Sequence, residues 1–100
     1  MSYDQVKTRL EAKMSEPHGL KARFQFDFGD DGVILIDTND TPLTVSEEEG
    51  EADVTLSCSI DVLQGILDGT QDPNFAFMTG KLKVRGSMGL ALKLNSLLED

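Results

Sequence analysis

The stretch NFAFMTGKLKVRGSMGLALKLNSLL, residues 74–98, contains three secondary-structure signals in succession. The pair Asp72-Pro73 comes just before it and Gly80 lies within it, and these are typical of the start and the end of a short helix. Residues 81–85, KLKVR, alternate charged and apolar side chains, which predicts a strand with one exposed face. A glycine turn then leads to Ser87, which is suited to cap a closing helix.

The closing helix has more apolar surface than packing against one sheet requires. At about 100° per residue, its apolar residues form a main stripe and a second edge. The main stripe contains Leu90, Ala91, Leu94, Leu97 and Leu98, and the second edge contains Met88 and Leu92. A helix packed on a sheet needs a stripe of little more than ~100°. The surplus is therefore expected to contact another helix, another subunit or a bound apolar molecule.

The first half of the chain predicts one helix followed by four strands. Ser2 is placed to cap the helix, which ends near Met14 before the helix-breaking sequence EPHG. Its thin apolar stripe contains Tyr3, Val6, Leu10 and Met14. The strand at residues 20–28 alternates strictly. It directs Leu20, Ala22, Phe24, Phe26 and Phe28 to one face and Lys21, Arg23, Gln25 and Asp27 to the other. Further strands are predicted at residues 33–36, 42–46 and 52–58, separated by turn signals.

From Ser59 the apolar period becomes helical and ends at Gly69. Its stripe contains Ile60, Leu63, Ile66 and Leu67. The predicted order is therefore helix, four strands, two helices, strand and helix. Strands grouped before helices indicate an α+β fold in which helices cover one face of the sheet. With 100 residues and no repeat or linker, residues 1–100 are expected to form a single domain.

The charge pattern excludes nucleic-acid binding and stable membrane insertion. The net charge is −9, and thirteen acidic residues but no Lys or Arg lie between Phe24 and Gly80. Such a surface repels phosphates and anionic membranes. No apolar run reaches the ~18 residues of a membrane span. The single Cys58 and the absence of a signal-peptide pattern predict a cytoplasmic protein.

The basic residues outside this acidic region have a structural interpretation. They include Lys21, Arg23, Lys81, Lys83 and Arg85, all in or beside predicted strands. We expect them to pair with acidic residues of neighbouring strands. This interpretation is favoured over a basic docking patch.

Neither a catalytic nor a metal site is predicted. His18 is the only histidine and has no second ligand beside it, so a surface role is expected. Cys58 continues the apolar face of a strand and is interpreted as an inert core thiol. The acidic run at residues 47–53 lacks the spacing of a calcium loop and is interpreted as a solvated turn. No cofactor, metal or nucleophile–base pair follows from these residues, and the protein is predicted not to be an enzyme.

The run FMTGKLKVRGSMGLALKLNSLL resembles the C-terminal signature of the sterol carrier protein 2 family. The residues that match that pattern are Gly80, Lys81, Leu82, Val84, Gly86, Met88, Ala91, Lys93, Leu94 and Leu97. The segment GEADVTL at residues 50–56 is similar to a strand of the same family. The resemblance implies a five-stranded mixed β-sheet, covered on one face by helices, that encloses a hydrophobic tunnel for lipids.

The leading functional hypothesis is non-catalytic binding or carriage of an apolar ligand. Fatty acids, acyl-CoA, quinones and sterol-like lipids all fit it, and the sequence does not choose among them. The residues predicted to line the ligand space are Phe24, Phe26, Ile66, Phe75, Phe77, Met78, Met88 and Leu92. The alternative is an interaction or dimerisation module that supports an enzyme of lipid or quinone metabolism. A monomer or weak homodimer, with at most transient membrane contact, is expected in either case.

Overall fold

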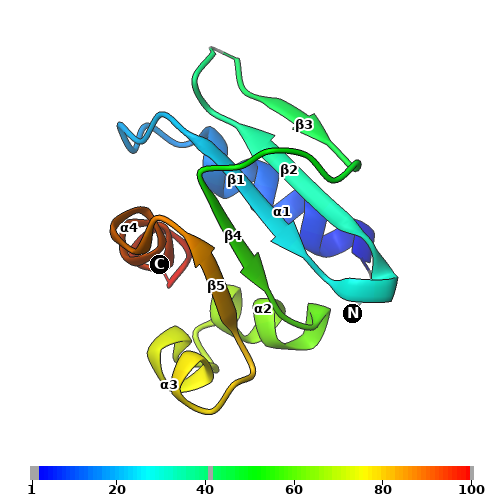
Figure 1. Cartoon of the computed structure of the whole chain (residues 1–100), viewed down its shortest axis with the longest axis vertical. Helices are drawn as coiled ribbons and strands as arrows, with labels where there is room; N and C mark the ends of the chain where they lie inside the picture. Colours follow the sequence, from blue (N-terminus) through cyan, green and yellow to red (C-terminus); the bar gives the residue numbers. More distant parts are fainter. Residues whose placement is uncertain (1–2, 41, 100) are drawn as a thin grey trace.

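The protein folds into a five-stranded sheet with helices on one face (Figure 1). The structure is a computed structural model and describes residues 3–40 and 42–99. The elements follow in the order α1 (Tyr3–Ser15), β1 (Arg23–Asp27), the 3-10 turn η1 (Gly29–Asp31), β2 (Val33–Asp37), β3 (Thr44–Ser46), β4 (Val54–Ser57), α2 (Ile60–Asp68), α3 (Pro73–Met78), β5 (Lys83–Gly86) and α4 (Met88–Glu99). This is the α+β order predicted from the sequence. The expected helix cap Ser2 lies outside the described residues.

The sheet is mixed, with the strand order β3-β2-β1-β4-β5. β1 pairs antiparallel with β2 and parallel with β4, whereas the outer pairs β2–β3 and β4–β5 are antiparallel. The chain must therefore travel from β3 at one edge to β4 on the far side of β1. It does so through residues 47–53, which cross the sheet on the face without helices (Figure 1).

β1 is shorter than the predicted strand at residues 20–28. At its start, the side chain of Thr38 takes the place of the backbone hydrogen-bond partners of the Leu20 carbonyl and the Ala22 N–H. The Thr38 hydroxyl donates to the Leu20 carbonyl at 2.8 Å and accepts from the Ala22 N–H at 3.1 Å. At the other end, the Phe28 N–H donates to the Gly32 carbonyl at 2.8 Å and closes the turn around η1. The predicted alternation is nevertheless confirmed on the helix-covered face, where Ala22 and all three phenylalanines are buried.

Gln25 lies on the face predicted to be exposed, and that prediction is wrong for this residue. The segment at residues 47–53 covers it, so that only 3% of Gln25 remains exposed. Its side-chain carbonyl accepts from the Gly50 N–H at 3.0 Å, and its amide donates to Thr55 Oγ1 at 3.4 Å. Leu35 is buried beneath the same segment, with its Cδ2 close to Gly50. The acidic run is thus a crossover, although Glu47–Glu51 themselves are exposed as expected.

The core lies between the sheet and the helices α1, α2 and α4. Each helix contributes the stripe that its sequence predicts. The completely buried members are Val6 and Leu10 of α1, Leu63 and Ile66 of α2, and Leu94 and Leu98 of α4. They pack against Phe24, Phe26 and Leu56 of the sheet in one continuous cluster. Tyr3 closes one end of this core, with its ring edge-to-face against Phe28 at a centroid distance of 6.2 Å.

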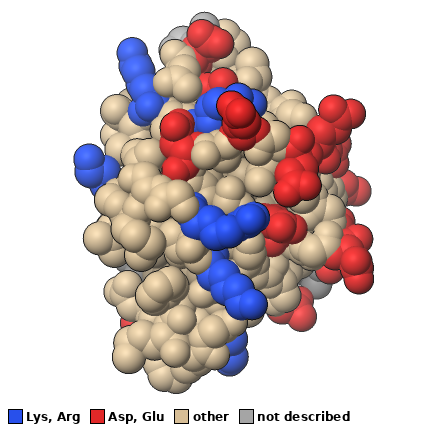
Figure 2. All heavy atoms as spheres, in the orientation of Figure 1, with Lys and Arg blue, Asp and Glu red and all other residues tan. Residues whose placement is uncertain are grey.

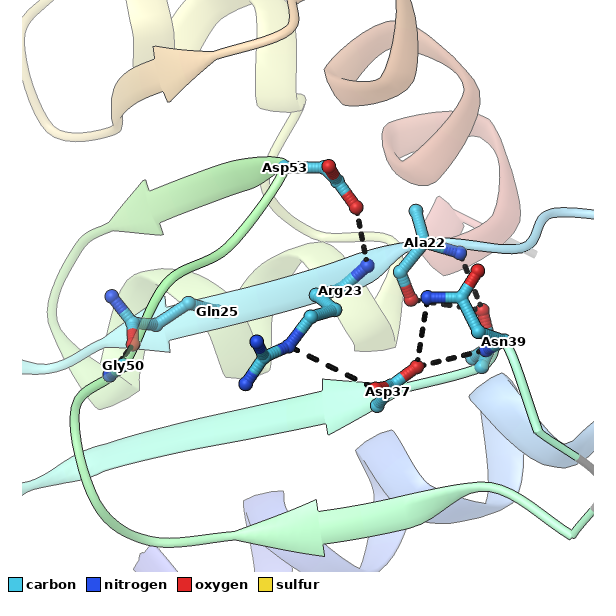
Figure 3. A network of polar contacts seen from close by, with 8 residues as sticks. Ala22, Arg23, Gln25, Asp37, Asn39, Gly50 and Asp53 are labelled. Atoms are coloured by element: carbon cyan, nitrogen blue, oxygen red, sulfur yellow. Dashed lines mark hydrogen bonds and ion pairs between the residues drawn. The ribbon is translucent and has the colours of Figure 1, made fainter.

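Asp53 joins three segments at the start of β4. Its carboxylate accepts from the Arg23 N–H at 2.8 Å (Figure 3). Its own N–H donates to the Arg23 carbonyl at 2.9 Å. Its carbonyl accepts from the Ser87 N–H at 2.9 Å, which fixes the turn between β5 and α4. The side chain of Arg23 lies opposite Asp37, 3.8 Å from its carboxylate, so the predicted cross-strand pairing is confirmed for this residue.

Candidate functional site

The residues predicted to line a ligand space fall into two groups. Phe24, Phe26 and Ile66 are completely buried in the core. The others are exposed on α3 and α4, to between 46% and 81%: Phe75, Phe77, Met78, Met88 and Leu92. We call these five residues the exposed apolar set. Within the described part of the chain, every large apolar side chain classed as exposed belongs to this set.

α3 is a short helix with well-defined ends and little anchoring. The Asp72 carboxylate accepts from the Asn74 N–H at 2.9 Å, and Pro73 occupies the first turn, as predicted. After Gly80, which has φ +78°, the backbone returns and donates from Lys81 and Leu82 to the Ala76 carbonyl. Pro73 and Ala76 are the only residues of α3 that are buried. The remaining apolar side chains of the helix therefore project into solvent.

α4 shows the surplus of apolar surface that its sequence predicts. Ser87 Oγ accepts from the Leu90 N–H at 3.2 Å and caps the helix. The main stripe packs inward, since Leu94 is completely buried and Leu90 is partly buried against the core. The second edge faces away from the sheet and leaves Met88 49% and Leu92 58% exposed. No other helix of the described residues covers this edge.

A cleft that sequence reasoning missed lies at the end of α1. It has a volume of about 460 Å³ and lies between the loop after α1 and the loop before β3. Its apolar lining includes Met14, Leu20 and Leu43. The His18 imidazole closes one wall: its Nδ1 accepts from the Leu20 N–H, so its Nε2 carries the proton that is donated to the Met14 carbonyl. The lining comes from two separate segments, residues 14–21 and residues 38, 40, 42 and 43, and no local pattern joins the two.

A second cleft, of about 410 Å³, lies beside the connection from α3 to β5. Its lining includes Phe28, Cys58, Lys81 and Lys83. Burial raises the pKa of the Cys58 thiol to about 12, and the charge of Asp27 acts in the same direction. The thiol is therefore protonated at neutral pH, in agreement with the inert role expected from the sequence.

Cys58 is expected to resist alkylation in the folded protein. At pH 8 its raised pKa leaves about a thousandfold less thiolate than an ordinary cysteine has, and the thiolate is the nucleophile. Iodoacetamide labelling followed by mass spectrometry should be slow in native buffer and fast in denaturant. Rapid labelling of the native protein would show that the thiol is accessible and ionised.

The expected pairing of Lys81, Lys83 and Arg85 with acidic residues is wrong. Among the described residues, no carboxylate forms an ion pair with any of these three side chains. β5 is an edge strand whose only neighbour is β4, where Ser57 and Thr55 lie opposite Lys83 and Arg85. The local sequence predicts the strand, whereas the strand order decides which residues lie beside it.

Neither a metal site nor a membrane-spanning helix is found in the described part of the chain. No group of three or more His, Cys, Asp or Glu side chains there is arranged to hold a metal ion. None of its helices is long and apolar enough to cross a bilayer.

The chain is similar to a known protein family and to solved structures of the same fold. Residues 4–99 match the model of the SCP-2 sterol transfer family. The chain is 35% identical over 84 residues to hydroxysteroid dehydrogenase-like protein 2 of Bos taurus. The matched region covers 80% of this chain but only 20% of that protein. Among solved structures, sterol carrier protein domain 2 of Helicoverpa armigera superimposes with a TM-score of 0.72 and 25% identity, covering 96% of this chain and 84% of that one. Palmitated SCP2L2 of Aedes aegypti has the same fold, with a TM-score of 0.75, 22% identity and coverage of 100% and 96%.

Proposed function

Because the chain belongs to the SCP-2 sterol transfer family, a family of lipid-binding and lipid-transfer domains, we propose that it is a non-catalytic carrier of a small apolar ligand. Fatty acids, acyl-CoA, quinones and sterol-like lipids are the ligand classes that fit. The proposal needs no cofactor or metal, because binding rests on desolvation of the ligand. The observation that carries it is that, in the part of the chain the structure describes, the exposed large apolar side chains are concentrated on α3 and α4.

Burial of these side chains by a ligand is energetically favourable. Removing apolar surface from water is worth roughly 25 cal/mol per Å², from which the entropy of association is subtracted. Met78 is 81% exposed and Leu92 58%, so a covering acyl chain would gain most of this energy. Flexible Met and planar Phe side chains adapt to chains or rings of different shape.

The three buried members of the predicted lining would be reached by a movement of α3. This helix is held by only two buried side chains, whereas α4 packs through a full stripe. We propose that an acyl chain enters between α3 and α4 and extends toward Ile66, with Phe24 and Phe26 at the inner end. A hydrophobic tunnel would then form when the ligand binds.

Fatty-acid binding should depend on the exposed apolar set. The Aedes aegypti protein of this fold is palmitated, which makes palmitate the first ligand to test. We expect a fluorescent fatty-acid analogue to bind and to be displaced by palmitate. Phe77→Gln or Leu92→Gln should weaken binding about five- to tenfold, since each removes roughly half of an apolar side chain's transfer energy. Asn74→Gln and Ser96→Gln change exposed neighbours on the same helices and should leave the affinity unchanged.

Two results would contradict the proposal. Absence of binding to fatty acyl, acyl-CoA, quinone and sterol probes would exclude a carrier function, and a concentration-dependent dimer would then favour the interaction module. Binding that is insensitive to both Gln variants would instead place the ligand elsewhere. The cleft of about 460 Å³ beside Met14 and Leu43 is the next position to examine.

A further inference from the structure

The positive and negative charges of this acidic protein lie on different parts of its surface. Figure 2 shows basic side chains in a row over β5, with acidic side chains gathered toward the side of β2 and β3. The row consists of Lys81, Lys83 and Arg85. Lys83 and Arg85 alternate along β5 and therefore point to one face of this edge strand, and Lys81 lies two residues before the strand begins. All three are exposed, and none has an acidic partner among the described residues. This clustering is not required by the fold.

The basic row is bordered by the exposed apolar set. Phe75, Phe77 and Met78 lie in the helix directly before β5, and Met88 and Leu92 lie in the helix directly after it. The space-filling view shows uncharged surface beside the basic row, on the side of α3 and α4 (Figure 2). Cations next to exposed Phe, Met and Leu are the combination that binds at the boundary between lipid headgroups and acyl chains.

We propose that the face formed by β5, α3 and the outer edge of α4 docks on an anionic lipid bilayer. The three cations contact the headgroups, and the exposed apolar set enters the boundary below them. The remaining surface is strongly acidic, with a net charge of −9 for the whole chain, so any other orientation is repelled. Charge complementarity therefore selects both the partner and the orientation.

Docking in this orientation goes beyond the proposed carriage and explains how the apolar ligand would be transferred between the protein and the membrane. The proposed entrance between α3 and α4 would face the bilayer, so an apolar ligand would pass between protein and membrane without crossing water. The two ideas remain separable. Docking is measured on ligand-free protein with vesicles, whereas ligand binding is measured without vesicles.

Vesicle sedimentation with two charge-matched variants tests the docking face. The first variant is Lys81→Gln/Lys83→Gln/Arg85→Gln, and the control is Lys7→Gln/Lys13→Gln/Lys21→Gln, so both lose three positive charges. Ligand-free protein is mixed with vesicles of equimolar phosphatidylcholine and phosphatidylserine. Each cation near an anionic surface raises affinity roughly fivefold, so the first variant should bind about 100-fold more weakly. The control should change severalfold at most, and salt at about 1 M should abolish the difference. Equal thermal melting of the three proteins excludes unfolding as the cause.

An apolar variant tests contact with the lipid. Met78→Gln alters the most exposed member of the set, and we expect severalfold weaker binding to the same vesicles.

Equal losses of vesicle affinity in the two charge variants, or equal binding of the parent protein to pure phosphatidylcholine vesicles, would overturn the proposal. No vesicle binding, together with a dimer in sedimentation velocity that Met78→Gln dissociates, would assign this face to a second copy of the chain.

Discussion

Leu94→Trp is expected to lower the melting temperature by roughly 10–20 °C, whereas Leu92→Trp leaves it within a few degrees. Enlarging a packed core residue forces strain of about 1–3 kcal/mol, and in a domain of this size each kcal/mol changes the melting temperature by roughly 4–8 °C. Leu94 has no exposed surface, so the indole has no space. Leu92 is 58% exposed, and the indole can extend into solvent.

The two leucines make a matched pair because they lie on one helix and receive the same new side chain. Thermal unfolding followed by far-ultraviolet circular dichroism is sufficient to compare them. Equal loss of stability in both variants would mean that α4 is buried on all sides, and the exposed apolar set would then lose one of its two helices. Equal stability would mean that Leu94 does not pack on the sheet.

Gly86→Ala is expected to be at least as destabilising, by about 3 kcal/mol, or roughly 12–24 °C in melting temperature. Gly86 has φ +93°, which is unfavourable for a residue with a side chain. An added Cβ would also lie 2.4 Å from the Asp53 carbonyl oxygen and 3.1 Å from Val54 Cα, and these are backbone atoms that cannot turn aside. The substitution would separate β5 from β4 and disturb the hydrogen bond from Ser87 to Asp53.

Gly89→Ala is the control for this prediction. Gly89 is exposed in the first turn of α4, and an added Cβ there would meet only Ser87 Oγ, at 3.9 Å. Alanine favours a helix over glycine by roughly 0.5–1 kcal/mol, so this variant should melt a few degrees higher than the parent. A Gly86→Ala protein as stable as the parent would show that β5 does not approach Asp53 as closely as the structure indicates.

Local sequence was sufficient for the elements and for the inward stripes of the helices. Periodicity depends only on neighbouring residues, so Leu10 of α1, Leu63 of α2 and Leu94 of α4 are buried as their spacing predicts. Helix caps are local in the same sense, and the predicted roles of Asp72 and Ser87 are confirmed. The mixed five-stranded sheet followed from the family resemblance.

The predicted ligand lining could be divided only by the tertiary structure. Phe26 and Phe77 are the same residue type, yet one is completely buried and the other is 46% exposed. The difference arises because β1 is a central strand covered by helices, whereas α3 lies on the chain between α2 and the edge strand β5. Apolar character is a property of the residue, and exposure is a property of its neighbours.

The sequence by itself determined the α+β class, the element order and the surplus apolar edge of α4, because hydrophobic periodicity and caps act over a few residues. Only the tertiary structure decided that residues 47–53 cross the sheet and bury Gln25, since the parallel pairing of β1 with β4 joins segments 30 residues apart. The same strand order leaves Ser57 and Thr55 beside the cations of β5. A charge is neutralised by what lies next to it in space, and that position depends on the order of strands in the sheet.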